Sequence, residues 1–178
     1  AVGPGGALPP AGTGVTDTVT SSTRISLTNA GAFVANNGSM TTVVGTITNT
    51  GSILLNSSNN VADFILSGDV TLTGGGTLNL INYDRVYGSG ILTNVNNTIQ
   101  GYTNSNGYSL VLDQIGIVNQ TAGIIDANVA DLTLFGNPNM LTGLDNHGLM
   151  PAKRERLPYR YGRGGAGLPN NSATTTPA

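Results

Sequence analysis

The amino-acid sequence predicts an all-β fold, a right-handed parallel β-helix (β-solenoid) of about six coils with non-repetitive terminal segments. Three observations lead to this prediction. The central part of the chain consists of short runs of alternating apolar and polar residues, a seven-residue unit recurs along it, and the 178 residues are rich in Gly, Thr, Asn and Ser. Alternation favours strands, and a fixed period of about 20 to 50 residues favours a repeat architecture.

Residues 1–14 form the first segment, AVGPGGALPPAGTG, which contains three Pro and five Gly. Pro lacks the N–H group that a helix or an interior strand needs, and Gly weakens both elements. We therefore expect residues 1–14 to be a Gly/Pro-rich N-terminal linker or cap.

Residues 15–150 are expected to be the β-solenoid repeat body. This segment contains runs such as RISLT, SILL, DVTLT and TLNLI, and each of these runs is followed by Asn or Gly. Strands of about four or five residues with immediate turns account for this pattern.

One unit, apolar-Thr-Asn-x-Gly-x-apolar, recurs through the body. Its four clear copies are offset by 20, 25 and 20 residues, and a looser copy through Asn119 and Gly123 and a degraded copy at 144–148 follow them. The clear copies begin with Leu27-Thr28-Asn29, Ile47-Thr48-Asn49, Leu72-Thr73-Gly74 and Leu92-Thr93-Asn94. Their Gly position is occupied by Gly31, Gly51, Gly76 and Asn96.

Coils of this length stack at the strand spacing of about 4.8 Å, which places equivalent residues directly above one another. We therefore expect the apolar position to fill the interior, and the Asn and Gly positions to form the corners. The four Thr residues of the clear copies should form one ladder. Like charges would repeat at the same spacing, which explains why charged residues make up only 9% of the chain. The chain lacks the dense Leu framework of a leucine-rich repeat, whereas a β-sandwich stays open as an alternative.

Three stretches carry a family resemblance: DVTLTGGGTLNLI (69–81), GSGILTNVNNTIQG (88–101) and GIVNQTAGIIDANV (116–129). They resemble the passenger repeats of bacterial autotransporter and haemagglutinin-like adhesins. The resemblance implies a right-handed parallel β-helix that is exported across the envelope, and hence a secreted or extracellular location at the bacterial cell surface. Two departures from the family are expected: no C-terminal membrane barrel, and no repeat after Met150.

Residues 151–178 form a basic, Gly/Pro-containing C-terminal tail. Residues 1–150 contain eight Asp and two Arg, whereas the tail contains one Glu and five basic residues, Lys153, Arg154, Arg156, Arg160 and Arg163. One interpretation is an intersubunit clasp, in which these five residues dock on the acidic body of a neighbouring copy. The alternative is a solvated terminus without a partner.

The densest group of charged and aromatic residues in the body is Tyr83, Asp84, Arg85 and Tyr87. Stacked Tyr rings beside an Asp–Arg pair suit carbohydrate contact, because the rings pack on sugars and the charged groups hydrogen-bond to hydroxyls. The alternative is a loop between coils with a local salt bridge.

The sequence argues against catalysis. Because the chain has no Cys and one His, it offers no thiolate metal site, and no triad, phosphate loop or calcium nonapeptide is present. We therefore expect no catalytic, metal or cofactor-binding residues and no cofactor. A polysaccharide lyase would need several acidic ligands and a basic residue, which the body supplies poorly.

No apolar run approaches the roughly 20 residues that span a bilayer, so no transmembrane segment is expected.

These features predict a non-enzymatic extracellular structural or adhesive β-helix. It would be either an adhesin passenger segment or a subunit of a surface filament that assembles end to end, since the ends of a solenoid expose unpaired backbone groups. The expected partners are further copies of the chain and host or environmental glycans, and no nucleic acid. The alternative function is a polysaccharide-binding or polysaccharide-degrading β-helix, similar to a lyase, a hydrolase or a phage tail fibre.

Overall fold

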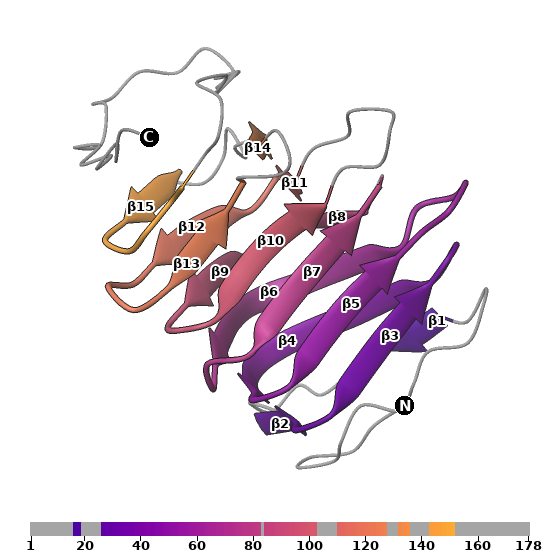
Figure 1. Cartoon of the computed structure of the whole chain (residues 1–178), viewed down its shortest axis with the longest axis horizontal. Helices are drawn as coiled ribbons and strands as arrows, with labels where there is room; N and C mark the ends of the chain where they lie inside the picture. Colours follow the sequence, from indigo (N-terminus) through magenta and orange to yellow (C-terminus); the bar gives the residue numbers. More distant parts are fainter. Residues whose placement is uncertain are drawn as a thin grey trace.

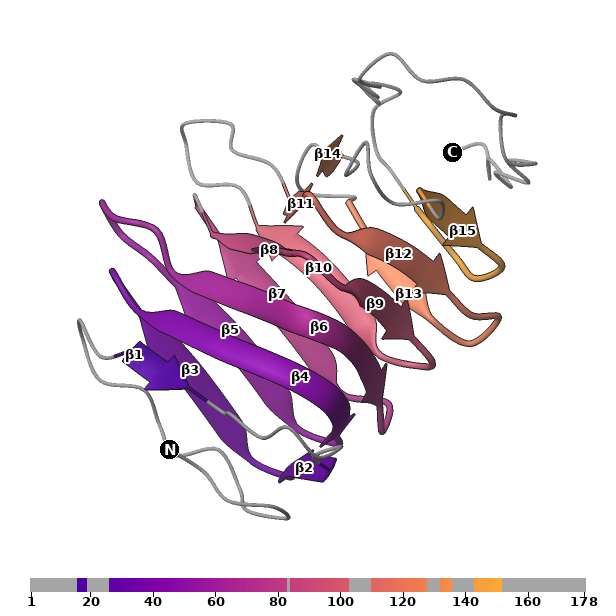
Figure 2. The ribbon, with the colours of Figure 1, turned by 180° about the vertical axis from the view of Figure 1, so that it is seen from behind.

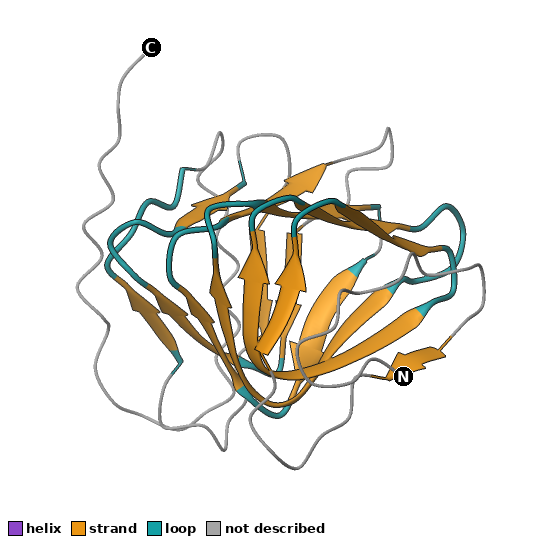
Figure 3. Cartoon of the chain, turned by 90° about the horizontal axis from the view of Figure 1, so that it is seen from below, coloured by secondary structure: helices purple, strands orange, loops and turns teal. Residues whose placement is uncertain are grey.

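The structure is a computed structural model that describes residues 16–18, 26–82, 84–102, 110–127, 132–135 and 143–151 (Figure 1). All regular elements of the described residues are strands, and no helix occurs among them (Figure 3). Consequently, no helix long and apolar enough to cross a membrane is present in this part of the chain. The strands are β1 (Thr16–Thr18), β2 (Ser26–Asn29), β3 (Ala32–Asn36), β4 (Met40–Asn49), β5 (Ser52–Asn56), β6 (Asp63–Thr73), β7 (Thr77–Ile81), β8 (Arg85–Gly88), β9 (Ile91–Asn94), β10 (Thr98–Tyr102), β11 (Leu110–Asp113), β12 (Gly116–Asn119), β13 (Ile124–Asp126), β14 (Leu132–Phe135) and β15 (Leu144–Asn146).

The strands form two parallel sheets, which confirms the predicted β-solenoid class. The five-stranded sheet, in the order β13-β10-β7-β5-β3, faces the viewer in Figure 1, and the ten-stranded sheet faces the viewer in Figure 2. Every pairing between the described strands is parallel, and its partners come from successive coils (for example β3 with β5 and β5 with β7). The chain therefore alternates between the two sheets and rises by one strand at each circuit.

The ten-stranded sheet consists of two side-by-side stacks of strand segments. The long strands β4 and β6 run through both stacks, whereas later coils divide the same path between β8 and β9 and between β11 and β12. The register of β4 on β6 shifts between Val43 and Gly45, and Gly45 has a φ of 87°. Gly adopts this left-handed backbone without steric cost, so it lets β4 bend from one stack into the other.

The core lies between the two sheets and is built from stacked apolar residues. In the five-stranded sheet one register column has no exposed surface in any coil, and it contains Phe33, Ile53, Leu78, Ile99 and Ile125. The opposite sheet contributes a column of Phe64, Val86 and Leu112, all at most 1% exposed. Burial of apolar side chains in every coil stabilises the stack along its whole length.

The number of coils is slightly smaller than the six expected. The five strands of the smaller sheet bound about four complete turns. The degraded copy at 144–148 contributes β15 and a single bridge between Ile124 and Leu149 in place of a full strand in this sheet. Within the described residues, the last coil therefore pairs with the smaller sheet through one bridge alone.

The predicted Thr ladder is correct for three coils and wrong for the fourth. Thr28 pairs with Thr48 and Thr48 with Thr73, but Thr93 pairs with Thr71. We call the stacked Gly positions of the repeat the Gly column. Asn97 rather than Asn96 continues this column, because the backbone N–H of Thr98 donates to the carbonyl of Gly76 and that of Ile124 donates to the carbonyl of Asn97. The segment from Leu92 to Asn97 is one residue longer than that from Leu72 to Gly76. A slip by one residue would turn Leu92 to solvent, so the strand slips by two.

Side-chain amides connect the coils at the corner between the sheets, and we call this series the amide ladder. Asn29 donates to Asn49 (2.8 Å), Asn49 to Asn97 (3.1 Å), Asn94 to Asn119 (2.9 Å) and Asn119 to Asn146 (2.8 Å). Most of these side chains are at most 5% exposed, so their hydrogen bonds satisfy polar groups that water cannot reach.

Candidate functional site

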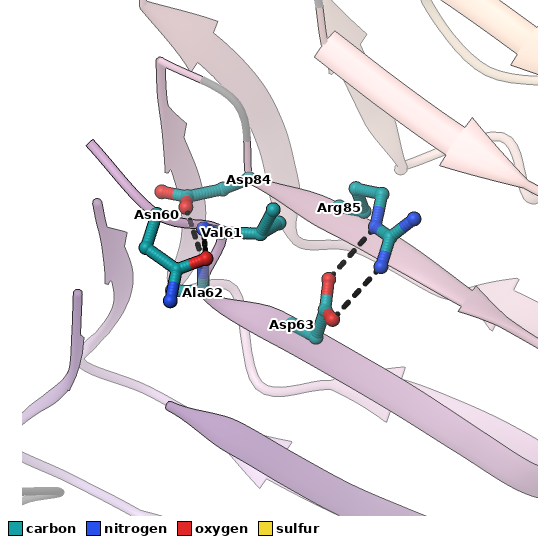
Figure 4. A network of polar contacts seen from close by, with 6 residues as sticks. All are labelled: Asn60, Val61, Ala62, Asp63, Asp84 and Arg85. Atoms are coloured by element: carbon teal, nitrogen blue, oxygen red, sulfur yellow. Dashed lines mark hydrogen bonds and ion pairs between the residues drawn. The ribbon is translucent and has the colours of Figure 1, made fainter. Parts of the chain in front are cut away.

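The outer face of the ten-stranded sheet carries an ion pair between neighbouring coils. Asp63 on β6 and Arg85 on β8 are register partners. Nε of Arg85 donates to Oδ1 of Asp63 at 2.8 Å, and Nη2 donates to Oδ2 at 2.9 Å (Figure 4). The hydrogen bonds to Asp63 raise the pKa of Arg85 above its ordinary value, and burial opposes this shift. This bidentate geometry fixes the guanidinium plane and cross-links the two coils.

Tyr87 extends this polar group along β8. It lies two residues after Arg85 and therefore on the same face of the strand. The guanidinium carbon of Arg85 lies 4.6 Å from the centroid of the Tyr87 ring. The Arg85 side chain is thus held by a carboxylate and by an aromatic ring, and its side chain is still 37% exposed. Asp63, Arg85 and Tyr87 form what we call the lateral cluster.

Asp84 faces the opposite way, into the solenoid, because neighbouring residues on an extended chain alternate in direction. It has no exposed surface, and its carboxylate accepts hydrogen bonds from the backbone N–H groups of Ser57 (3.2 Å), Ala62 (2.9 Å) and Ile81 (3.1 Å). Burial raises the pKa of Asp84, and its hydrogen bonds act in the opposite direction. The carboxylate of Asp84 thereby connects, through hydrogen bonds, the end of β5, the start of β6 and the end of β7.

The structure thus divides the predicted carbohydrate group. Arg85 and Tyr87 lie together on the outer surface, whereas Asp84 is buried on the inner side. Tyr83 lies outside the described residues, as do the five basic residues of the predicted clasp, Lys153, Arg154, Arg156, Arg160 and Arg163. The chemistry that this surface offers is a set of hydrogen-bond donors beside an aromatic ring.

Asp63 is the member of the lateral cluster that the expected site did not include. The sequence carried a signal for it, because Asp63 and Arg85 have opposite charge and lie 22 residues apart, within the range of the repeat offsets. In a solenoid such a spacing places two residues side by side on successive coils. A search for opposite charges at the repeat period would have found the pair.

Asn37 performs a second unexpected role at the corner that follows the five-stranded sheet. Its side-chain oxygen accepts from the backbone N–H groups of Ser58 (2.9 Å), Asn59 (3.0 Å) and Asn60 (2.8 Å). Three consecutive N–H groups form a concavity that suits an oxygen ligand, and Asn37 fills it from the preceding coil. The side chain therefore holds a loop that has no strand pairing of its own.

The single His lies at the last described coil. Nε2 of His147 is 2.8 Å from Oδ1 of Asp145, and both side chains are more than half exposed. His147 borders an open hollow of about 340 Å³, which is lined by Val95, Gln120, Thr121, Ala122 and His147. No group of three or more His, Cys, Asp or Glu residues with the geometry of a metal site occurs in the described ranges.

Comparisons with known proteins do not assign the chain to a family. No protein-family model matches it, and searches of the curated proteins and of the solved structures found no match either. The fold and the geometry of the side chains are therefore the basis for any function, and the resemblance to autotransporter and adhesin passengers stays a prediction.

Proposed function

We propose that this chain is a non-enzymatic structural or adhesive β-solenoid that acts at the bacterial cell surface. It serves either as an adhesin passenger segment or as a subunit of an extracellular filament that assembles end to end. The observation that carries the proposal is the use of polar side chains to hold one coil on the next. The amide ladder, the carboxylate of Asp84 and the ion pair of the lateral cluster all connect different coils.

This use of side chains suits a mechanical or spacing role. A protein that extends from a surface must keep its coils together along one axis, and each of these bridges adds a contact across a coil boundary. The hydrogen bonds between amides lie in the interior, where they are stronger than in water.

The experiment that tests the proposal uses the full chain at a range of concentrations. Negative-stain electron microscopy and light scattering should detect rods that lengthen with concentration, and a surface-coating assay should detect retention on abiotic or glycan-coated surfaces. Monodisperse short particles that are not retained on any surface would contradict the proposal.

The lateral cluster favours a second candidate function, the binding of acidic polysaccharides. Arg85 keeps N–H groups beyond the two that contact Asp63, and its exposed fraction leaves them accessible to a carboxylate or sulfate. Titration of the chain with acidic polysaccharides should show saturable binding that weakens at least about tenfold in Arg85→Ala. Arg85→Lys keeps the charge and is the matched control for the bidentate geometry. Release of reducing or unsaturated ends would instead indicate a degrading enzyme.

A further inference from the structure

The two ends of the described solenoid carry the same corner sequence. The first coil contains Leu27-Thr28-Asn29-Ala30-Gly31, and the last coil contains Leu144-Asp145-Asn146-His147-Gly148. Both follow the pattern Leu-x-Asn-x-Gly, in which three residues with Asn at the centre separate the apolar residue from the glycine. The first coil of one molecule and the last coil of another therefore present the same corner geometry to each other.

The contact between the first and second coils shows how two such corners stack. The second coil contains the equivalent unit, Ile47 to Gly51. The N–H of Thr50 donates to the carbonyl of Asn29 at 2.9 Å, and the N–H of Ser52 donates to the carbonyl of Gly31 at 2.8 Å. The side chain of Asn29 donates to that of Asn49 at 2.8 Å. These three bonds are a template for the stacking of one Leu-x-Asn-x-Gly corner on another.

The amide ladder has a direction. In each step the Nδ2 group of the earlier coil donates to the Oδ1 atom of the later coil. The ladder thus begins with the acceptor oxygen of Asn29 and ends with the donor group of Asn146. Among the described residues, the Asn146 amide donates only a long bond of 3.3 Å to the carbonyl of Gly148. The two ends are complementary, and a head-to-tail arrangement brings donor and acceptor together.

The backbone hydrogen bonds at these corners also have a direction, which is opposite to that of the side-chain amides. The N–H groups of Ser52, Thr77, Thr98, Ile124 and Leu149 each donate to a carbonyl of the preceding coil, at distances of 2.8 to 3.0 Å. The corresponding donor of the first coil is the N–H of Ala32, and no described coil precedes it. The corresponding acceptor of the last coil is the carbonyl of Gly148. Edge groups of this kind are a template for pairing with another chain.

Gly31 provides an independent observation. A Cβ atom at Gly51, Gly76 or Gly148 would collide with a carbonyl oxygen of the preceding coil, which explains why these positions are glycine. A Cβ atom at Gly31 would meet no atom within 4 Å. Nothing in the described coils therefore requires glycine at position 31. A stacked second copy does, because the carbonyl of its Gly148 would occupy the same place relative to Gly31 as the carbonyl of Gly31 does relative to Gly51.

From these observations we infer that copies of this chain stack head to tail, with the last coil of one copy on the first coil of the next. The inference rests on the filament form of the proposed function and specifies its interface. Asn146 of one copy donates to Asn29 of the next, and the N–H groups of Ala30 and Ala32 donate to the carbonyls of Asn146 and Gly148. Because this contact joins two different surfaces and lies along the solenoid axis, it does not close and it produces a filament.

The test compares the full chain with two variants of the first coil. Gly31→Ala adds a Cβ atom that the single molecule accommodates but the stacked copy does not. Ala32→Pro removes the N–H donor on the outer edge of β3, where Pro is tolerated at the first residue of an edge strand. Thr93→Ala, on the lateral surface of β9, is the matched control. Light scattering over a concentration series and electron microscopy measure assembly, and thermal unfolding of the dilute chain measures the fold.

The expected result is end-to-end rods for the wild type and for Thr93→Ala. Both variants of the first coil should need at least about tenfold more protein to assemble, at an unchanged unfolding temperature of the dilute chain. Rods formed equally well by Gly31→Ala and Ala32→Pro would overturn the stacking but leave the structural role in place.

Two other outcomes would also overturn the inference. A wild-type chain that stays monomeric at every concentration has no such interface, and the adhesive role would then be judged by surface retention alone. A lower unfolding temperature of the dilute chain in both variants would show that a segment of the same chain covers this edge in place of a second copy.

Discussion

The side-chain nitrogen of Asn49 lies 3.1 Å from the side-chain oxygen of Asn97, although 48 residues separate them. The coil between them has glycine at both corner positions, Gly74 and Gly76. A Cβ atom at either glycine would collide with the backbone of Asn49. Because the intervening coil has no side chain at these two positions, the amides of the second and fourth coils contact each other directly. This contact shows that the Asn and Gly positions act as one unit across three coils.

The amide ladder should be a measurable part of the stability. Asn119 has no exposed surface, accepts from Asn94 at 2.9 Å and donates to Asn146 at 2.8 Å. Asn119→Ala leaves the buried amide of Asn94 without this acceptor, so the free energy of unfolding should fall by about 1–3 kcal/mol. Urea denaturation measures the change. Asn56→Ala, at an exposed residue of β5, should change it by less than about 0.5 kcal/mol, and equal effects would refute a role for the ladder.

Position 51 should tolerate no side chain. In Gly51→Ala the new Cβ atom collides with the carbonyl of Gly31, a backbone atom that cannot rotate away. The coils must separate, so we expect a loss of about 1–3 kcal/mol or more. Gly31→Ala is the matched comparison in the same column. If both variants unfold at the same urea concentration as the wild type, the close approach of the coils is incorrect.

The buried carboxylate of Asp84 should make stability depend on pH. Its pKa is raised in the folded chain by burial, so the folded state binds the proton more tightly than the unfolded state does. The contribution is therefore fully present below the ordinary pKa of 3.8 and is lost as the pH rises through the raised pKa. Asp84→Asn cannot ionise and should lack this slope.

The measurement is the free energy of unfolding of the wild type and of Asp84→Asn from pH 3 to pH 7. The wild type should lose stability relative to the variant as the pH rises. Asp69→Asn, which neutralises an exposed carboxylate, controls for the change in net charge. A difference that does not vary with pH would contradict the assigned effect of burial.

The ion pair between Asp63 and Arg85 should contribute modestly. Because the Arg85 side chain is 37% exposed, solvent screens the pair, and a coupling energy of about 0.5–1 kcal/mol is expected. A double-mutant cycle with Asp63→Asn and Arg85→Met measures it. The coupling should decrease at high salt, and a coupling of zero would show that the cross-link between the two coils is without effect.

The sequence was sufficient for the class of fold and for the positions that repeat without interruption. The apolar position of the first three copies predicted the buried residues Phe33, Ile53 and Leu78, whereas the fourth copy has Thr98 there and the column continues one residue later, at Ile99. The offset of 20 residues correctly paired Asn29 with Asn49. These features depend only on the period of the repeat and on the preference of apolar side chains for the interior.

Corner lengths were harder to predict. The triplet Leu92-Thr93-Asn94 resembles Leu72-Thr73-Gly74, yet it lies two residues out of that register because the following corner differs by one residue. Similarity of residue types did not reveal the slip, which depends on keeping Leu92 inside. The burial of Asp84 could not be predicted from the sequence either. It depends on hydrogen bonds from the backbone N–H groups of three separate segments, which only the fold brings together.

The most direct test of a structural solenoid is X-ray diffraction from aligned assemblies of the full chain. Strands that run across the axis, stacked in every coil and continuing from copy to copy, predict a strong reflection at about 4.8 Å along the fibre axis. At a concentration at which only the wild type assembles, Gly31→Ala should give no oriented pattern. A reflection at this spacing perpendicular to the axis, or assemblies without any such repeat, would contradict the account.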